Sequence, residues 1–409
     1  MANRLTTLAS SINDRVGKLS AYLSQNNLPC PSFDAEAASH APLGGEAEAI
    51  ALELQDLGLE LHDLLRGPIG LVLNHHLPPI PIYDMILRFG IASKVPLEGD
   101  ISFADLSKST GIDQDVLTRL LHYGILHRIF QEKRPGYISH SVLSKLMRDD
   151  QGMQNLVGMI QEDIVQPWRF IADALQKWPG AEDMDQVALL LAEKRTSTTF
   201  WNILAERPER AERFAKTMSA FSVDEDIGAD YPFEQLGAGT LVESGGSTGG
   251  VAFKIAERHK DLKIIVQDLD EIVKTAKERE GCNVSFMTHD FFKEQPVKGA
   301  DAYMMRWVLH DWSDTHAARI LQALVPVLKA GTKILIVDAV VPPFGAVPET
   351  SQRHLLKFDI SMFALFNAGE RTLDQWKALF ARADERFQLQ RVWPLRNSQL
   401  SLLELVWSP

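Results

Sequence analysis

The chain has 409 residues, of which 45% are hydrophobic and 23% are charged, and its formal net charge is −12 at pH 7. This length and composition predict a globular protein with more than one hydrophobic core. The sequence contains neither a recognisable signal peptide nor an apolar run long enough to cross a membrane, so we expect a cytoplasmic protein. Its two cysteines, Cys30 and Cys282, are too few for a disulfide framework or a zinc site, and we expect no bound metal. The negative charge argues against nucleic acid as the main partner.

The first third of the chain is expected to serve assembly. Residues 1–45 begin with a short predicted helix and continue as a mobile lead-in rich in Ser, Pro, Ala and Gly. Apolar residues at near-helical spacing between 46 and 65 predict an amphipathic helix whose partner is another subunit. From 82 to 149, the order helix, helix, turn, helix and hairpin is typical of a winged helix. Residues 113–150 carry six basic and five acidic side chains. Such a near-neutral module is a poor phosphate binder, so residues 46–150 are interpreted as a dimerisation domain of a homodimer.

The rest of the chain is expected to carry the chemistry. Residues 151–225 are predicted to be mainly helical, and some of their many aromatic side chains are expected to line a pocket for a flat substrate. From 226 to 409, short β-like runs alternate with helical runs, one of which is EIVKTAKER at 271–279. This alternation predicts a Rossmann-like, doubly wound and mostly parallel sheet, which a C-terminal antiparallel hairpin completes.

A glycine-rich turn follows the first predicted strand of this sheet. Its sequence runs from Glu243 to Gly249 and includes Gly245 and Gly246, where the missing side chains let a ligand approach the backbone. The dinucleotide fingerprint would need glycine at Ser244, which weakens an NAD hypothesis. Asp268 ends the next predicted strand, at the place where an acidic side chain can accept hydrogen bonds from ribose hydroxyls.

With these motifs, the chain resembles the plant and fungal class I O-methyltransferases that act on phenols and other small molecules, and the resemblance covers most of the sequence. It implies S-adenosylmethionine as the cofactor, bound by the turn, with Ser247 in place of the family's third glycine. The cofactor-binding residues that the resemblance implies are Glu243, Gly245, Gly246 and Gly249 in the turn, Asp268 for the ribose, Asp290 and Phe291 beside the adenine, and Arg306 near the methionine end.

The resemblance also places the family's catalytic histidine on His310, in LHDWSD. Its two supporting acids fall on Asp338, where many relatives have Glu, and on Glu370. A histidine with an unperturbed pKa of about 6.5 can remove the proton of a phenol during methyl transfer, and an adjacent carboxylate can orient its imidazole. The expected function is therefore transfer of a methyl group to a hydroxyl of an aromatic or polyketide-derived small molecule.

Two other classes of function stay open. Some fungal relatives of this fold are pericyclases, which accelerate a ring-forming rearrangement without moving a methyl group. A winged-helix regulator that senses a small molecule is disfavoured by the near-neutral charge of residues 113–150. The sequence identifies neither the acceptor nor the position that is methylated.

Overall fold

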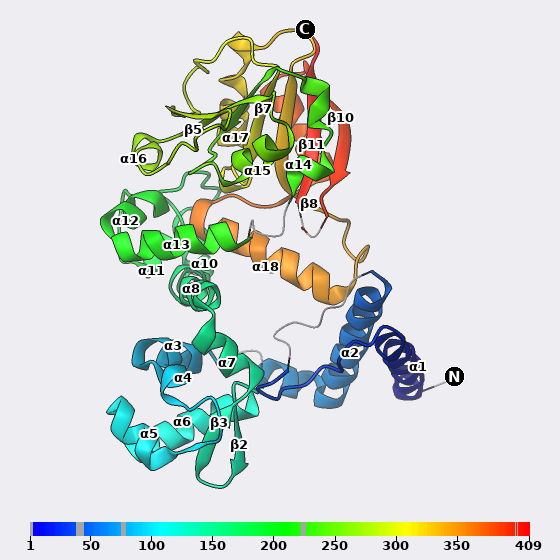
Figure 1. The fold of residues 1–409 in the computed structure, drawn as a ribbon, viewed down its shortest axis with the longest axis vertical. Coiled ribbons are helices and arrows are strands. Elements are labelled where there is room, and N and C mark those ends of the chain that lie inside the picture. Colours follow the sequence, from blue (N-terminus) through cyan, green and yellow to red (C-terminus); the bar gives the residue numbers. More distant parts are fainter. Residues whose placement is uncertain (1–2, 38–44, 75–78, 222–225, 397, 399) are drawn as a thin grey trace. The chain divides into compact units, whose positions relative to one another are not determined.

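The computed structural model describes residues 3–37, 45–74, 79–221, 226–396, 398 and 400–409. The chain divides into two compact units, which are coloured by sequence in Figure 1. The first unit comprises Met1–Glu162 and Val347–His354, and the second comprises Asp163–Ala346 and Leu355–Pro409. The predicted functional division at residues 45, 150 and 225 stays a prediction. No helix among the described residues is long and apolar enough to cross a membrane.

Two long helices open the first unit. α1 (Arg4–Gln25) is longer than the short helix that the sequence indicates, and its side chains Leu8 and Leu23 are buried. It packs against α2 (Glu46–Asn74), which extends beyond the predicted end at residue 65. α2 is kinked at Gly67, where φ is +65°, immediately before Pro68. Proline removes an intrahelical hydrogen bond and clashes with the preceding turn, which accounts for the kink.

The remainder of the first unit has the element order predicted for a winged helix. Its elements are α3 (Ile80–Phe89), α4 (Ile91–Lys94), β1 (Ile101–Ser102), α5 (Phe103–Thr110), α6 (Gln114–Leu126), β2 (Phe130–Arg134), β3 (Tyr137–His140), α7 (Val142–Asp149) and α8 (Gln151–Met159). Gly90 adopts φ +61° and separates α3 from α4, so the first helix of the predicted order is in fact two. The three strands form a sheet in the order β1-β3-β2, and one apolar core joins these helices to the sheet.

The second unit begins with helices and continues as an α/β sheet. A π-helical segment (Ile160–Val165) leads into α9 (Gln166–Trp168), α10 (Ile171–Lys177), α11 (Ala188–Ala192), α12 (Phe200–Glu206), α13 (Pro208–Phe221) and α14 (Ile227–Asp230). The sheet has the order β10-β11-β8-β7-β4-β5-β6, with β9 (Arg371–Thr372) paired to β8. Its strands are β4 (Thr240–Ser244), β5 (Lys263–Asp268), β6 (Val284–Thr288), β7 (Ala302–Arg306), β8 (Lys333–Val341), β10 (Phe387–Pro394) and β11 (Leu400–Trp407). Strands β4 to β8 are parallel and β10 and β11 are antiparallel, which confirms the predicted fold class.

Helices cover both faces of this sheet. Alternate residues of β8 enter two different cores: Ile334 and Ile336 pack with α17 (Asp314–Gln322) and α19 (Leu373–Ala383), whereas Leu335 and Val337 pack with α14 and α15 (Gly250–Arg258). Figure 1 shows α15 and α17 beside the strands. The strand order reverses at β4: β5 lies on one side of it, and β7 lies on the other. In open α/β sheets, ligands bind at such a switch point, at the carboxyl ends of the strands.

One predicted helix of this unit is much shorter than expected. The run at 271–279 was expected to be helical throughout, but α16 covers only Asp270–Val273. Residues 274–280 are exposed or half-buried, and five of the seven are charged. Short helices depend on burying an apolar face, and this segment has little apolar surface to bury.

Candidate functional site

The glycine turn joins β4 to α15 and requires its glycines. Gly245 and Gly249 adopt φ +75° and +79°, which favours residues without a side chain. A Cβ on Gly246 would lie 2.7 Å from Val266 Cγ1 and 2.8 Å from Glu243 Cδ, so a side chain does not fit there. The N–H groups of Gly245 and Gly246 both donate to the carbonyl of Gln267, at 2.7 and 3.2 Å. These bonds hold the turn against the end of β5.

Asp268 is tied to the same turn. Its Oδ2 accepts a hydrogen bond from the N–H of Ser247 at 2.8 Å, and its Oδ1 accepts one from the N–H of Leu269 at 2.8 Å. Ser247 itself adopts φ +54°, the left-handed region in which glycine is less strained. The family's third glycine would stand at this position, so its replacement by serine places a side chain in an unfavourable backbone conformation.

The other predicted cofactor residues lie in the same unit, at the ends of neighbouring strands. Glu243 is buried in β4, and burial raises its pKa to about 7 although Arg306, at the end of β7, opposes the shift. Glu243 Oε2 has no hydrogen-bond partner among the described residues. Phe291 lies against the turn, 3.8 Å from where a Cβ of Gly245 would be. Asp290 accepts a hydrogen bond from Phe292 N–H at 3.0 Å, within its own loop.

His310 and Glu370 meet although 60 residues separate them. His310 lies in a 3₁₀ turn (Leu309–Asp311) after β7, and Glu370 immediately precedes β9. The Nδ1 atom of His310 is 2.7 Å from Glu370 Oε1, and their side chains are 5% and 3% exposed. In this arrangement Nδ1–H donates to Glu370, which leaves Nε2 as the nitrogen that can accept a proton. The second oxygen of Glu370 is buried without a partner in the described part of the chain.

Two further carboxylates, Asp311 and Asp338, act on His310. Asp311 Oδ1 lies 3.4 Å from His310 Nε2. Asp338 in β8 has no exposed surface, and neither of its oxygens has a hydrogen-bond partner among the described residues. Burial raises the pKa of Asp338 to about 7 and that of Asp311 to about 6, although His310 opposes both shifts. Burial alone would lower the pKa of His310, but the charges of Asp311, Glu370 and Asp338 outweigh it and raise the pKa to about 10.

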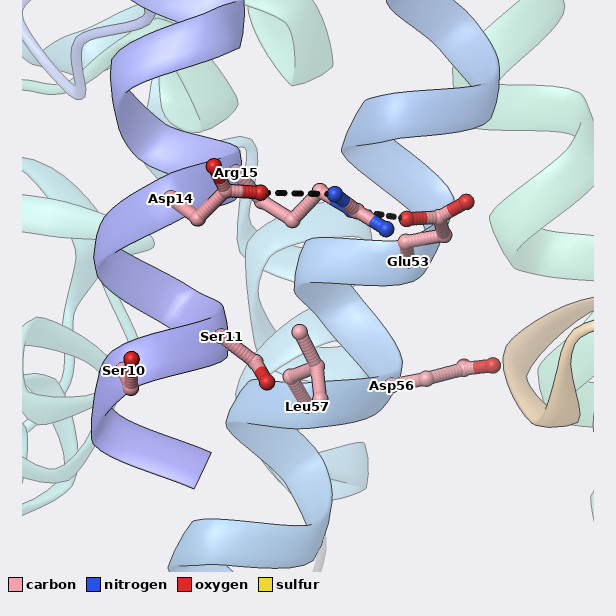
Figure 2. A pocket seen from close by; sticks show the side chains of 7 residues that line it. All are labelled: Ser10, Ser11, Asp14, Arg15, Glu53, Asp56 and Leu57. Atoms are coloured by element: carbon pink, nitrogen blue, oxygen red, sulfur yellow. Dashed lines mark hydrogen bonds and ion pairs between the residues drawn. The ribbon is translucent and has the colours of Figure 1, made fainter. Parts of the chain in front are cut away.

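Two cavities differ in how they relate to the predicted site residues. One, of about 510 Å³, is lined by Glu370 and by polar residues around it, including Asp359, Ser313 and Gln375. The other, of about 420 Å³, lies between α1 and α2 (Figure 2). There Arg15 extends from Asp14 across to Glu53, and Asp56 points away from α1. Ion pairs this exposed contribute little to stability. None of the predicted site residues lines this second cavity.

Comparison with known proteins identifies the family. A family model described as an O-methyltransferase domain matches residues 182–385. O-methyltransferase gsfB of Penicillium aethiopicum is 36% identical over 415 residues, which cover 100% of this chain and 99% of that protein. The chain belongs to the S-adenosylmethionine-dependent O-methyltransferase family. This confirms the resemblance on which the sequence analysis relied.

Solved structures support the methyltransferase fold across both units. The crystal structure of OxaC matches with a TM-score of 0.79 and 23% identity, over 98% of this methyltransferase and 100% of that chain. A structure entitled "A Pericyclic Reaction enzyme" matches with a TM-score of 0.75 and 23% identity, over 88% of this chain and 95% of the other. At these identities the likeness concerns the fold alone.

Several residues of the candidate site escaped sequence reasoning. Asp311 follows His310 directly, but nothing in the sequence indicates that its side chain turns back toward the imidazole. Trp307 adopts φ +54°, and its ring lies 5.0 Å from that of His310, nearly perpendicular to it. Asp359 accepts the backbone N–H of Glu370 at 2.8 Å. Contacts between residues this distant in the chain become visible only once the fold is known.

Proposed function

We propose that the chain transfers a methyl group from S-adenosylmethionine to a hydroxyl of an aromatic or polyketide-derived small molecule, with His310 as the general base. The observation that carries the proposal is the buried hydrogen bond of 2.7 Å between His310 Nδ1 and Glu370 Oε1, next to the carboxyl end of β7. This bond fixes the orientation of the imidazole and leaves Nε2 available to take the proton of the acceptor hydroxyl.

The residues of the glycine turn fit the cofactor. When bound, S-adenosylmethionine supplies a methyl group on a positively charged sulfonium. Asp268 would accept hydrogen bonds from the ribose hydroxyls, because a carboxylate oxygen can accept more than the single backbone bond that each of its oxygens now receives. The buried Glu243 Oε2, without a partner among the described residues, is an acceptor of the same kind. Asp290 and Phe291 would contact the adenine, and the Arg306 guanidinium would attract the methionine carboxylate.

The carboxylates around His310 determine when it can act as a base. With a pKa of about 10, His310 is an imidazolium in the free protein at neutral pH. It must lose a proton before it can accept one from the acceptor hydroxyl. Glu370 then stabilises the imidazolium that forms again when the proton is taken, as an orienting carboxylate does beside a catalytic histidine. Asp338 lies in the same charge cluster and favours the same protonated state.

Aromatic side chains beside the base support a flat acceptor. The Trp307 ring contacts the rings of both His310 and Phe358, at centroid distances of 5.0 and 5.7 Å. Its indole N–H is buried and has no acceptor among the described residues. Such a surface suits a planar ring with an oxygen at its edge, because the ring can stack while the oxygen accepts the indole hydrogen.

Incubation with radiolabelled S-adenosylmethionine and a panel of phenols and phenolic polyketides tests this proposal. We expect label to enter at least one acceptor, whose mass rises by one methyl group, and demethylated cofactor to accumulate. The absence of labelled product from every acceptor, together with wild-type binding of NAD in preference to S-adenosylmethionine, would contradict it.

The raised pKa of His310 favours a second candidate function. An imidazolium that stays charged at neutral pH is a hydrogen-bond donor and can polarise a carbonyl in a pericyclic rearrangement that requires no base. In that case the product would be an isomer of the substrate, with no change of mass and no demethylated cofactor. The mass of the product therefore separates the two candidates.

We also propose that the methyltransferase is a homodimer that buries the C-terminal half of α2. Four apolar side chains there are at least half exposed: Leu64, Leu65, Ile69 and Val72. A run of large apolar residues on one helix is typical of an interface. Light scattering should give the mass of a dimer, and Leu65→Glu with Ile69→Glu should produce monomers or aggregates. A wild-type monomer would contradict this proposal.

A further inference from the structure

Arg371 connects the segment that carries Glu370 to the turn that carries His310. Its guanidinium is almost completely buried, and three of its nitrogens donate hydrogen bonds. Nη1 donates to the carbonyl of Leu309 at 2.9 Å, and Nη2 donates to the carbonyl of Trp312 at 2.7 Å. Nε donates to Asp314 Oδ1 at 2.8 Å. The two carbonyls belong to residues on either side of His310, so Arg371 holds the backbone of the turn at both ends.

The turn needs such support. A 3₁₀ segment of three residues makes few hydrogen bonds of its own, and those here are long: Asp311 N–H donates to the Val308 carbonyl at 3.2 Å and Trp312 N–H to the Leu309 carbonyl at 3.3 Å. A bond from a guanidinium to a carbonyl is charge-assisted and therefore stronger than a neutral one. Arg371 is itself anchored, because β9 pairs with β8 at Val340 and its guanidinium lies over the Trp376 ring at 5.0 Å.

We infer that Arg371 is a positioning residue that sets the distance between His310 and Glu370, and so the direction in which His310 Nε2 points. This inference rests on the proposed function only in taking His310 as the group that needs to be positioned. The two residues adjacent in sequence, Glu370 and Arg371, then act together: one bonds the imidazole and the other bonds the backbone on either side of it. Lysine cannot replace the arginine, because an ammonium is a single point of donation and lacks the planar fork that reaches two carbonyls at once.

Proton NMR of the full-length protein tests the inference without an acceptor. The proton between His310 Nδ1 and Glu370 should give a downfield signal that is absent from His310→Ala and from Glu370→Gln. We expect this signal to disappear or move in Arg371→Ala and in Arg371→Lys, and to return in Arg371→Ala when guanidinium is added at a non-denaturing concentration, but not when neutral urea is added. Arg382→Ala is the matched control, since Arg382 lines the same cavity but is exposed, and its Nη2 donates to Thr315 Oγ1.

Kinetics with an acceptor that the wild type methylates supply a second readout. Arg371→Ala should lower kcat by about 10- to 100-fold, the range expected when a reacting group is displaced by up to an ångström, while the Kd of S-adenosylmethionine changes less than twofold. Guanidinium should restore part of the rate. An unchanged signal and an unchanged kcat in folded Arg371→Ala or Arg371→Lys would overturn the inference. If the wild type methylates no acceptor, the proposed function fails, but the NMR signal still decides the role of Arg371.

Discussion

The glycine turn and the His310 cluster lie at the carboxyl ends of strands in one sheet, but they accommodate buried charge differently. At the turn, each oxygen of Asp268 accepts a backbone N–H from a nearby segment. Around His310, three carboxylates converge, and both oxygens of Asp338 and one of Glu370 have no partner in the described part of the chain. The turn leaves one buried carboxylate oxygen, Glu243 Oε2, without a partner among the described residues, whereas the second region leaves three. The electrostatic cost is therefore larger around His310. Such a cost is typical of residues arranged for chemistry and not for stability.

The strongest test of this contrast is His310→Ala. Removing the base should reduce turnover by ~10²- to 10⁴-fold, because the acceptor must then lose its proton to water. The Kd of S-adenosylmethionine should barely change, since the glycine turn is untouched. The residual rate should rise with pH as the acceptor ionises by itself. His122→Ala, in the first unit, is the control and should leave turnover unchanged. Equal losses of kcat and of cofactor affinity in His310→Ala would contradict the division of labour between the His310 cluster and the glycine turn.

A pH profile sharpens the same point through Glu370. In the free wild type, the base is active only when neutral, so kcat/KM should rise with pH toward the raised pKa of His310, about 10. Glu370→Gln removes a negative charge that stabilises the imidazolium, so the pKa of His310 should fall and the rise should occur at lower pH. The maximal rate should nevertheless be ~10-fold or more below wild type, because the imidazole loses its orienting partner. A profile that does not move would mean that Glu370 does not interact with the base.

At the turn, substitutions should affect binding and spare the chemistry. Gly246→Val must displace Val266 or Glu243, and Asp268→Ala removes the acceptor at the end of β5. Each should weaken S-adenosylmethionine binding at least tenfold, about 1.4 kcal/mol, in calorimetry. Gly250→Ala is the matched control, because a Cβ there meets nothing within 4 Å and should change the Kd less than twofold. In all three variants the downfield His310 signal should persist; its loss in Gly246→Val would mean that the regions are coupled.

The same contrast explains what the sequence could predict. The glycine turn is a local motif, so Glu243 to Gly249 and the strand ending at Asp268 are visible as a pattern. His310, Asp338 and Glu370 were assigned through a family resemblance, and the structure places them in one charge cluster. Asp311, Asp359 and Arg371 carry no pattern, because their roles depend on contacts between β7, α18 (Glu349–Phe366) and β9 that only the fold creates.

The predicted helices teach a related lesson. Those with an apolar face to bury were found, as with α5 and α6, the second and third helices of the predicted winged-helix order. The charged run at 271–279 has helix-forming residues but no such face, and only its first turn is helical. Local propensity without burial was therefore a poor guide in this part of the chain.

The smallest expected effect concerns Ser247, the one departure in the turn from the family's glycines. A residue with a Cβ at φ +54° costs roughly 1 kcal/mol relative to its preferred conformations, and glycine does not incur that cost. Glycine also loses more backbone entropy on folding, roughly 0.5–1 kcal/mol, so the two terms nearly cancel. Ser247→Gly should therefore change the free energy of unfolding by only a few tenths of a kcal/mol, in either direction.

Thr248→Gly, at a position without positive φ, gains no such relief and should destabilise the protein by about 0.5–1 kcal/mol. Urea unfolding of the two variants measures the difference, and equal losses of stability would mean that the left-handed backbone at Ser247 is not strained. The N–H of Ser247 still donates to Asp268 in Ser247→Gly, so cofactor affinity should stay within a few-fold of wild type.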